Sequence, residues 1–247
     1  MLSRSASCQE SSPADLNMTS ENIFLKRYSE REDALAAISQ SVCDQLWSAL
    51  QSRNRASLGV CGGQTAAAIF PMLAQMPMDW ENIHIILIDD RWVDPTSHHS
   101  NECLVREGLL RGHATAAKFT ALKTRDGHAV DALRSVAACV ARAPLPIDCL
   151  FISMGSDGHI ASLFPGGREN LETEATVVAS TATAAPTERI SLGPAVLQSA
   201  RYSAIAVVGQ AKASMFDRAK TADDPFKFPI CHLLKPDGRR RDVFLSP

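Results

Sequence analysis

The sequence has no pair of cysteines at C-x-x-C spacing, although it contains seven cysteines, at positions 8, 43, 61, 103, 139, 149 and 231. An odd number of cysteines without close pairs argues against a disulfide framework and against a structural zinc site. Free cysteines are typical of proteins in a reducing compartment. We therefore expect a cytoplasmic protein.

A large net charge and long apolar runs are also lacking. The formal net charge is only −2 at pH 7, and the one basic run, Arg239-Arg240-Arg241, is too short to indicate binding of nucleic acid. No apolar run reaches the length of a membrane span. The first twenty residues are rich in serine and have no apolar core, which argues against a secretory signal. We expect a disordered extension over residues 1–28 and neither a nucleic-acid nor a membrane partner.

The rest of the chain is long enough for one domain. Of the 247 residues, 45% are hydrophobic and 21% are charged, as in ordinary globular proteins. No internal repeat and no linker rich in proline, glycine or serine divides the sequence. We expect a single domain over residues 29–247, as a monomer or a small homo-oligomer.

Helical and short apolar segments alternate along this domain. Ser29 and Glu32 have the spacing of a capping box before apolar residues at helical spacing, which predicts a helix over residues 30–51. Pro71 is expected to kink or split a helix over residues 64–76. Further helices are predicted over residues 101–110, 131–142 and 211–220, and a brief one from Pro194. Strands are predicted over residues 57–61, 83–88, 149–154, 177–179, 189–192 and 202–208.

This alternation predicts a three-layer α/β/α domain with a mainly parallel sheet. At the C-terminal end, Pro236-Asp237-Gly238 lies between apolar residues 230–234 and 243–245, which predicts a small hairpin. In open parallel sheets, ligands bind beyond the carboxyl ends of the strands. Residues that directly follow the predicted strands are therefore the candidates for a functional site.

Two glycine turns connect a predicted strand to a predicted helix. They are Cys61-Gly62-Gly63-Gln64-Thr65 and Gly209-Gln210-Ala211-Lys212. Glycine lets the backbone approach an anion closely, and the free N–H groups at a helix start can bind phosphate. A tight turn without any ligand would use the same glycines, and Lys212 alone would be read as a surface lysine.

Charged residues follow the strand over residues 83–88. Adjacent acids such as Asp89 and Asp90 more often belong to a polar loop than to a site. Arg91 is more informative, because a guanidinium binds carboxylates and phosphates through two hydrogen bonds.

A glycine-rich loop follows the strand over residues 149–154 and contains Asp157-Gly158-His159. A carboxylate beside an imidazole raises its basicity and holds its orientation. Histidine is the usual general base near neutral pH. A lone histidine is more often structural, but the position of His159 at the end of a core strand favours a catalytic role.

In this order the motifs resemble the 6-phosphogluconolactonase family, from about Ser29 to the end of the chain. Residues 155–166 are close to the family's glycine–acid–Asp-Gly-His-Thr-Ala-Ser-Leu-Phe-Pro motif. Residues 89–93 with 100–102 resemble its Asp-Glu-Arg-x-Val-Pro…Ser-Asn element, and residues 61–65 its phosphate loop. Residues 187–190 and 208–212 match two later family elements.

The resemblance implies the modified Rossmann-like fold shared with glucosamine-6-phosphate deaminases. It also implies hydrolysis of 6-phospho-D-glucono-1,5-lactone to 6-phospho-D-gluconate in the oxidative pentose phosphate pathway, with no required metal or other cofactor. Carried over by position, His159 is the base that activates water, with Asp157 beside it and Arg91 near the oxyanion. The residues that would bind the sugar phosphate are Gly62, Gly63, Gln64, Thr65, Asp89, Asn101, Arg189 and Lys212.

The sequence departs from the family pattern at Cys61, Ala66, Asp90 and Asp94, where the family has serine, proline, glutamate and proline. These departures concern the shape of the pocket and remove no proposed catalytic group.

Two alternative functions remain open. An amino-sugar-phosphate deaminase or isomerase of this fold has an acid five residues beyond the loop histidine, where this chain has Phe164. A non-catalytic sugar-phosphate-binding paralogue would be expected to lose His159 or Asp157, and both are present.

Overall fold

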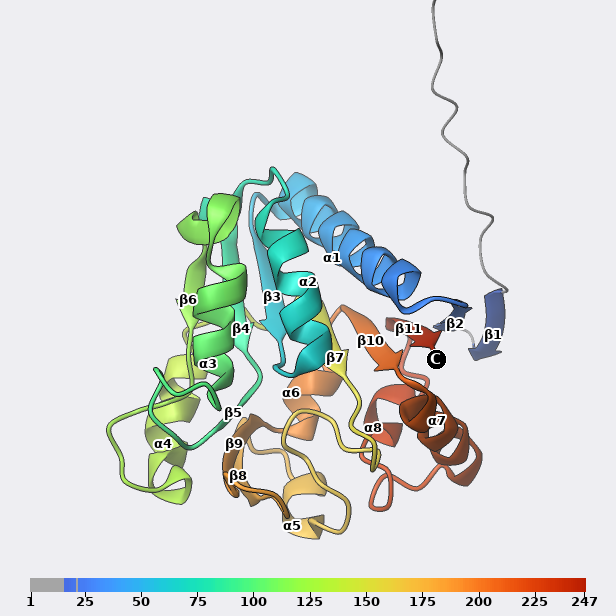
Figure 1. The fold of residues 1–247 in the computed structure, drawn as a ribbon. Coiled ribbons are helices and arrows are strands. Elements are labelled where there is room, and N and C mark those ends of the chain that lie inside the picture. The colour runs from blue at the N-terminus through green and yellow to red at the C-terminus, as the bar shows by residue number, and fades with distance from the viewer. Residues whose placement is uncertain (1–15, 21) are drawn as a thin grey trace, which may run out of the picture.

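A computed structural model describes residues 16–20 and 22–247, built around an eight-stranded sheet (Figure 1). The strand order is β1-β2-β11-β10-β7-β3-β4-β6. The bounds are β1 Leu16–Ser20, β2 Ile23–Arg27, β3 Ala56–Val60, β4 Ile83–Leu87, β6 Lys118–Thr120, β7 Cys149–Ser153, β10 Tyr202–Val208 and β11 Arg240–Ser246. All neighbours run parallel except β1 and β2, which are antiparallel. The predicted, mainly parallel sheet is confirmed.

Helices cover both faces of the sheet, and every residue of β3 and β10 is therefore buried. The helices are α1 Arg31–Arg53, α2 Gln64–Ala74, α3 Asn101–Leu104, α4 Ala129–Val140, α5 Arg168–Leu171, α6 Pro194–Gln198, α7 Gln210–Ala222 and α8 Cys231–Leu234. A π-helical stretch, Val105–Leu109, extends α3, and 3₁₀ turns span Trp80–Asn82 and Gly112–Ala116. The predicted three-layer α/β/α architecture is thus confirmed. Among the described residues, no helix is both long and apolar enough to cross a lipid bilayer.

Helix α1 forms where apolar periodicity predicts it, but its start differs from the prediction. Ile38, Val42 and Leu46 are fully buried and lie on one face of the helix. Glu30 precedes the first helical residue, and no side chain caps the helix there, so the predicted capping box is wrong. Acidic residues in the first turn, including Glu32, instead complement the positive end of the helix dipole.

Helix α2 is continuous through Pro71, so the predicted split does not occur. The helix ends at Ala74, which leaves the proline in its last turns.

The predicted C-terminal hairpin is wrong. Residues 231–234 form helix α8, and β11 pairs in parallel with β10 on one side and β2 on the other. Val243, Phe244 and Leu245 are all buried. Such a continuous apolar run is typical of a parallel strand covered on both faces, whereas a half-exposed hairpin strand would alternate.

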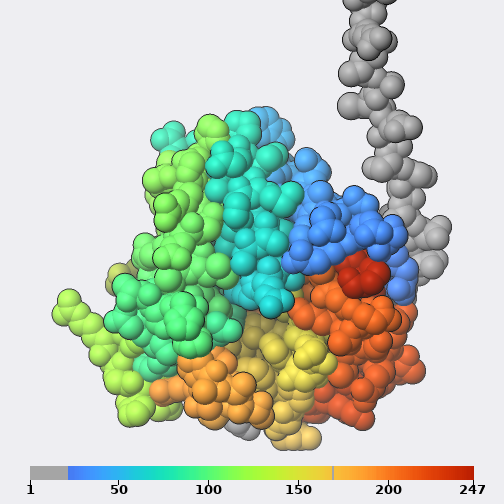
Figure 2. All heavy atoms as spheres, in the orientation of Figure 1, coloured from blue at the N-terminus to red at the C-terminus, as the bar shows by residue number. Residues whose placement is uncertain are grey.

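The N-terminal region contributes strands to the same sheet. Strand β2 pairs with β11, and β1 pairs with β2. Predicted disorder is therefore wrong for residues 16–20 and 22–27, whereas residues 1–15 lie outside the described residues. Figure 2 shows the blue N-terminal residues packed directly against the orange and red C-terminal ones.

A second, three-stranded sheet lies beyond the carboxyl ends of the central strands (Figure 1). It contains β5 Asp89–Arg91, β9 Glu188–Leu192 and β8 Val177–Thr181, all antiparallel. The backbone N–H of Leu192 donates to the carbonyl oxygen of Ile88 at 2.8 Å and so joins this sheet to the end of β4. The second sheet consequently covers the residues that follow β3, β4 and β7.

The order of the strands gives the place of a ligand site. Apart from β1 and β2, the strands lie in the order β6-β4-β3-β7-β10-β11. Numbered along the chain, this is the Rossmann order 3-2-1-4-5-6, with the reversal between β3 and β7. The crevice at such a reversal is the usual ligand site, and it lies between the Gly62-Gly63 turn and the Asp157–His159 loop.

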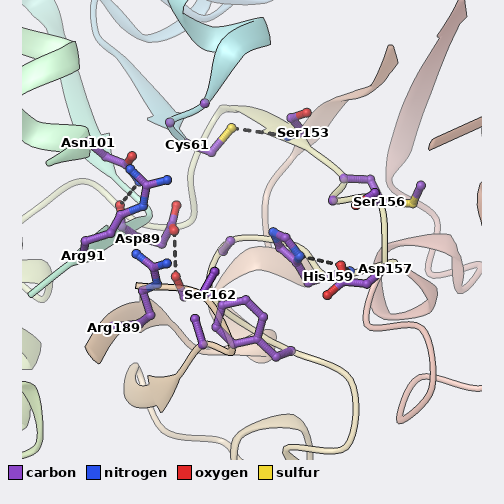
Figure 3. Close-up of a pocket in the computed structure, with 18 of the residues that line it drawn as sticks. Cys61, Asp89, Arg91, Asn101, Ser153, Ser156, Asp157, His159, Ser162 and Arg189 are labelled. Carbon is purple, nitrogen blue, oxygen red and sulfur yellow. Dashed lines mark hydrogen bonds and ion pairs between the residues drawn. The ribbon is translucent and has the colours of Figure 1, made fainter. Parts of the chain in front are cut away.

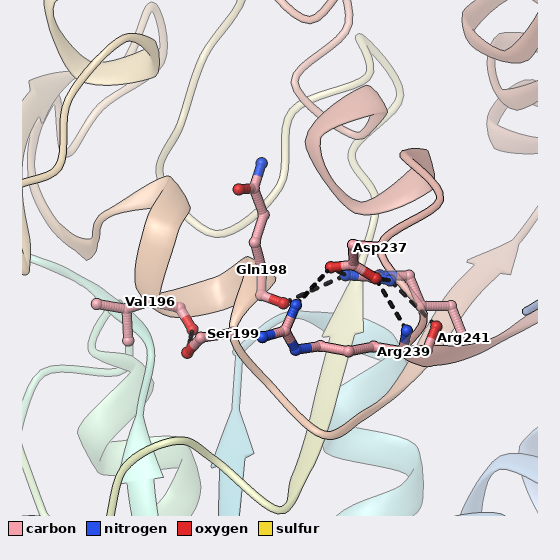
Figure 4. A network of polar contacts seen from close by, with 6 residues as sticks. All are labelled: Val196, Gln198, Ser199, Asp237, Arg239 and Arg241. Atoms are coloured by element: carbon pink, nitrogen blue, oxygen red, sulfur yellow. Dashed lines mark hydrogen bonds and ion pairs between the residues drawn. The ribbon is translucent and has the colours of Figure 1, made fainter.

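A polar network on the C-terminal part of the chain surrounds Arg241 (Figure 4). The Arg241 side chain is 1% exposed, and its two terminal nitrogens donate to both carboxylate oxygens of Asp237. Nη2 also donates to the carbonyl oxygen of Gln198 at 3.2 Å. The network therefore joins the end of α6 to the start of β11.

Candidate functional site

A cavity of about 430 Å³ opens between the carboxyl ends of β3 and β7 and the second sheet. Of the residues predicted for the site, the following line it: Gly62, Gly63, Gln64, Asp89, Arg91, Asn101, Asp157, His159, Arg189 and Lys212. Thr65 does not, because the first turn of α2 directs its side chain into the interior, where it is buried. Apart from Thr65, the structure brings the separate sequence motifs together in one place (Figure 3).

The Gly62-Gly63 turn joins β3 to the N-terminus of α2. Gly63 has φ 93°, a conformation that side chains rarely adopt. A Cβ atom on Gly62 would overlap the carboxamide of Asn101. Asn101 cannot easily move aside, because it is buried and its Nδ2 donates to the carbonyl oxygen of Asp89 at 2.9 Å. Both glycines therefore keep the helix N-terminus open to the cavity.

His159 is held by Asp157 in the loop after β7. Its Nδ1 lies 2.6 Å from Oδ1 of Asp157, which also accepts the backbone N–H of His159 at 3.1 Å. Burial alone would raise the pKa of Asp157, but the hydrogen bonds and charge of His159 outweigh it and lower that pKa. An ionised carboxylate only accepts hydrogen bonds, so Nδ1 carries the proton. Nε2 of His159 is then left as the basic nitrogen.

Neighbouring residues fix this orientation of the imidazole. Gly155 leaves room for the ring, because a Cβ atom at that position would overlap it. The backbone N–H of Gly155 donates to the carbonyl oxygen of His159 at 2.8 Å, and the ring of Phe164 lies 5.1 Å from the imidazole between centroids. The His159 side chain remains 32% exposed, which leaves it accessible to water and substrate.

Asp89 and Asp90 have different surroundings. Asp90 accepts hydrogen bonds from the backbone N–H groups of Asn101 and Glu102 at 2.6 and 3.0 Å, and from the Ser100 hydroxyl at 2.9 Å. It therefore organises the start of α3 and does not line the cavity. The carboxylate of Asp89 does line it and accepts a hydrogen bond from Ser162 Oγ at 2.8 Å. Burial raises the pKa of both acids.

Arg91 and Arg189 face each other across strands β5 and β9. Like charges directly opposite each other destabilise a sheet unless an anion compensates them. Arg91 donates to the carbonyl oxygen of His99 at 2.6 Å, whereas Nη1 of Arg189 is buried and has no partner among the described residues. Arg189 is only 8% exposed, and burial followed by the charge of Arg91 lowers its pKa. A buried, unpaired guanidinium donor is costly and indicates an anion site.

Lys212 lies at the first turn of α7 and contacts the end of β7. Its Nζ donates to Ser153 Oγ at 3.2 Å, and burial lowers its pKa. The backbone N–H of Ser153 in turn donates to Cys61 Sγ at 3.3 Å. Burial raises the pKa of Cys61 to about 12, so this thiol is protonated and is not a nucleophile.

Sequence reasoning missed Ser153 and Ser162, which also line the cavity. Ser153 ends β7 and Ser162 lies within the motif that contains His159, but serine is common at strand ends and in loops, and nothing in the sequence sets these two apart. Within the part of the chain that the structure describes, no group of three or more His, Cys, Asp or Glu residues is arranged to hold a metal ion.

A family model described as glucosamine-6-phosphate isomerases/6-phosphogluconolactonase matches residues 29–242. The 6-phosphogluconolactonase of Pseudomonas aeruginosa is 32% identical over 218 residues, covering 86% of this chain and 92% of that protein. That of Rhizobium meliloti is 32% identical over 224 residues, covering 88% and 97%. The crystal structure of a 6-phosphogluconolactonase from Shewanella baltica is 33% identical, with a TM-score of 0.88 over 94% of this chain and 100% of that one.

Proposed function

Because the chain belongs to the glucosamine-6-phosphate isomerase/6-phosphogluconolactonase family, we propose that it hydrolyses 6-phospho-D-glucono-1,5-lactone to 6-phospho-D-gluconate. One observation carries this proposal: an oriented imidazole shares a cavity with three cations that form no salt bridge in the described structure. The cations are Arg91, Arg189 and Lys212. An anionic substrate that needs a general base fits this arrangement.

The phosphate occupies the anion site formed by the Gly62-Gly63 turn, Arg189 and Lys212. Gln64 and Thr65 contribute backbone N–H groups at the start of α2, where the helix dipole favours negative charge. Thr65 thus takes part through its backbone, since its side chain is buried. Asp89 and Asn101 shape the pocket around the sugar ring.

The reaction follows from the free Nε2 of His159. A water molecule attacks C1 of the lactone and gives its proton to Nε2, while the carbonyl electrons move onto oxygen. Arg91 or backbone N–H groups stabilise that oxyanion. The intermediate collapses, the bond from C1 to the ring oxygen breaks, and the imidazolium returns its proton to that oxygen. Asp157 stabilises the imidazolium between the two transfers.

The structure favours lactone hydrolysis over amino-sugar-phosphate isomerisation. Phe164 packs on the His159 ring at the position where the deaminase pattern has an acid. An apolar ring cannot supply that second carboxylate. We propose a cytoplasmic enzyme that requires no cofactor and acts on a free sugar phosphate, as a monomer or a small homo-oligomer.

The direct test is hydrolysis of freshly generated 6-phosphogluconolactone, with the spontaneous opening of the ring subtracted. We expect fast turnover of the phosphorylated lactone and much slower turnover of unphosphorylated glucono-1,5-lactone, because the cations bind the phosphate. A folded protein that accelerates neither reaction, or that instead releases ammonia from an amino-sugar phosphate, would contradict the proposal.

Gly62→Ala is expected to lower kcat/KM about ten- to a hundredfold, because the new methyl group must displace the buried Asn101 side chain. Asn101 lines the cavity, and a misplacement of about 1 Å in a group that positions the substrate can lower the rate by about a hundredfold. Gly127→Ala is the matched control, since a Cβ atom there meets nothing within 4 Å. Equal kcat/KM values for the two variants would show that the closeness of Gly62 and Asn101 is unimportant.

A further inference from the structure

Ser153 is the last residue of β7, and its hydroxyl lies in the wall of the cavity between Cys61 and Lys212. Its oxygen accepts a hydrogen bond from Lys212 Nζ at 3.2 Å. In the described structure this is the one hydrogen bond of the hydroxyl, so its own proton is uncommitted. Its backbone N–H donates to Cys61 Sγ at 3.3 Å, which ties the ends of β7 and β3 together.

The position of the Lys212 ammonium group depends on its hydrogen bond to Ser153. The Lys212 side chain is partly buried, and it forms no salt bridge within the described residues. A lysine side chain has four rotatable bonds, so a single fixed acceptor decides where its charge lies. Ser153 Oγ is that acceptor, and it holds the charge at the cavity wall.

A hydroxyl that accepts from an ammonium group becomes a better donor, because hydrogen bonds in a chain polarise one another. An anion that accepts a hydrogen bond from Lys212 can therefore accept a second one from the Ser153 hydroxyl. Hydrogen bonds to a charged group are roughly twice as strong as neutral ones.

We propose that Ser153 is a phosphate-binding residue, which holds Lys212 in place and donates a hydrogen bond from its hydroxyl to the phosphate of the sugar. The inference rests on the proposed function for the identity of the sugar, but not for the presence of a phosphate. Cys61 acts through Ser153 as a positioning residue, since its neutral sulfur accepts the backbone N–H that fixes the end of β7.

Calorimetric titration of 6-phosphogluconate, gluconate and inorganic phosphate into wild type and Ser153→Ala tests the proposal. We expect the Kd of both phosphate compounds to rise about tenfold, which is the loss of one hydrogen bond to a charged group. Gluconate binding should not change. In the lactonase assay, KM should rise by a similar factor while kcat stays within about twofold.

Two further comparisons separate this role from a structural one. In a Lys212→Ala background, Ser153→Ala should have a much smaller effect, because the two groups act on one anion. Ser199→Ala is the matched control: its hydroxyl donates to the carbonyl oxygen of Val196 at 2.7 Å, outside the cavity, and phosphate affinity should not change. Ser153→Thr keeps the hydroxyl and should restore most of the affinity.

Unchanged phosphate affinity in a folded Ser153→Ala variant would overturn the proposal, as would an equal loss for gluconate and 6-phosphogluconate. The wild type could also lack lactonase activity and still bind 6-phosphogluconate more tightly than the Ser153→Ala variant does. That result would support the phosphate-binding role of Ser153 and refute the proposed reaction. A wild type that binds no phosphate compound would refute both.

Discussion

His159→Ala should lower kcat for the phosphorylated lactone by about 10²–10⁴-fold, the usual contribution of a general base. The imidazole is the group in the cavity whose orientation fits proton transfer: Nδ1 is committed to Asp157, and Nε2 is free. KM should change little, because the cations that hold the phosphate remain. Steady-state kinetics after subtraction of spontaneous hydrolysis give both constants.

His128→Ala is the matched control for this experiment. His128 also lies beside an acid, with its Nδ1 3.4 Å from Oε1 of Glu188, but it is outside the cavity and mostly exposed. Its removal should leave kcat unchanged. Full turnover by a folded His159→Ala variant would remove this residue from the mechanism and leave Asp89 as the next candidate base.

Asp237→Asn should destabilise the protein by about 2–4 kcal/mol, close to the usual cost of removing one partner of a buried ion pair. Arg241 is 1% exposed and would stay buried with its main counter-ion gone, although the carbonyl oxygens of Gln198 and Arg239 still accept one hydrogen bond each. The Asp237 side chain is 27% exposed, which places the cost below that of a fully buried pair. Thermal unfolding should occur about 10 °C lower.

The same pair predicts how stability depends on pH. Hydrogen bonds from Arg241 hold the pKa of Asp237 well below its usual range. A carboxyl group whose pKa is lower in the folded state stabilises the protein fully above its unfolded pKa, about 3.9. That stabilisation should be lost as the pH falls below about 4, and the Asn variant should lack this part of the acid dependence.

Glu172→Gln provides the comparison, because Arg168 and Glu172 have the same i,i+4 spacing but are 68% and 50% exposed. Its cost should not exceed about 0.5 kcal/mol. Equal chemical denaturation midpoints for the Asp237 and Glu172 variants would show that the burial of Arg241 gives the pair no special weight.

The sequence predicted the central strands well, because β3, β4, β7 and β10 are short apolar runs next to glycine or charged residues. It failed where tertiary pairing decided the structure. The turn residues before β11 suggested a hairpin, yet that strand lies between β2 and β10. Strand β2 was missed because its five residues include Lys26 and Arg27, which weaken the apolar pattern.

The residues of the candidate site that lie in the sequence motifs could be predicted. His159 and Lys212 follow strand ends, so their meeting follows from a parallel sheet. The register that sets Arg91 opposite Arg189 could not be predicted, since it depends on a second sheet formed by segments about a hundred residues apart. Nor could the role of Ser153, which becomes visible only through its contact with Lys212.

The position of β11 has a consequence for how the chain folds during synthesis. The ribosome makes β2 before the central strands β3, β4, β7 and β10 and β11 after them, yet β2 joins the central sheet through β11. Until residues 240–246 leave the exit tunnel, β2 lacks the neighbour that links it to β10. Contacts this distant in sequence form slowly and leave strand edges open for longer. A strand that is synthesised after both of its neighbours therefore completes the sheet between them.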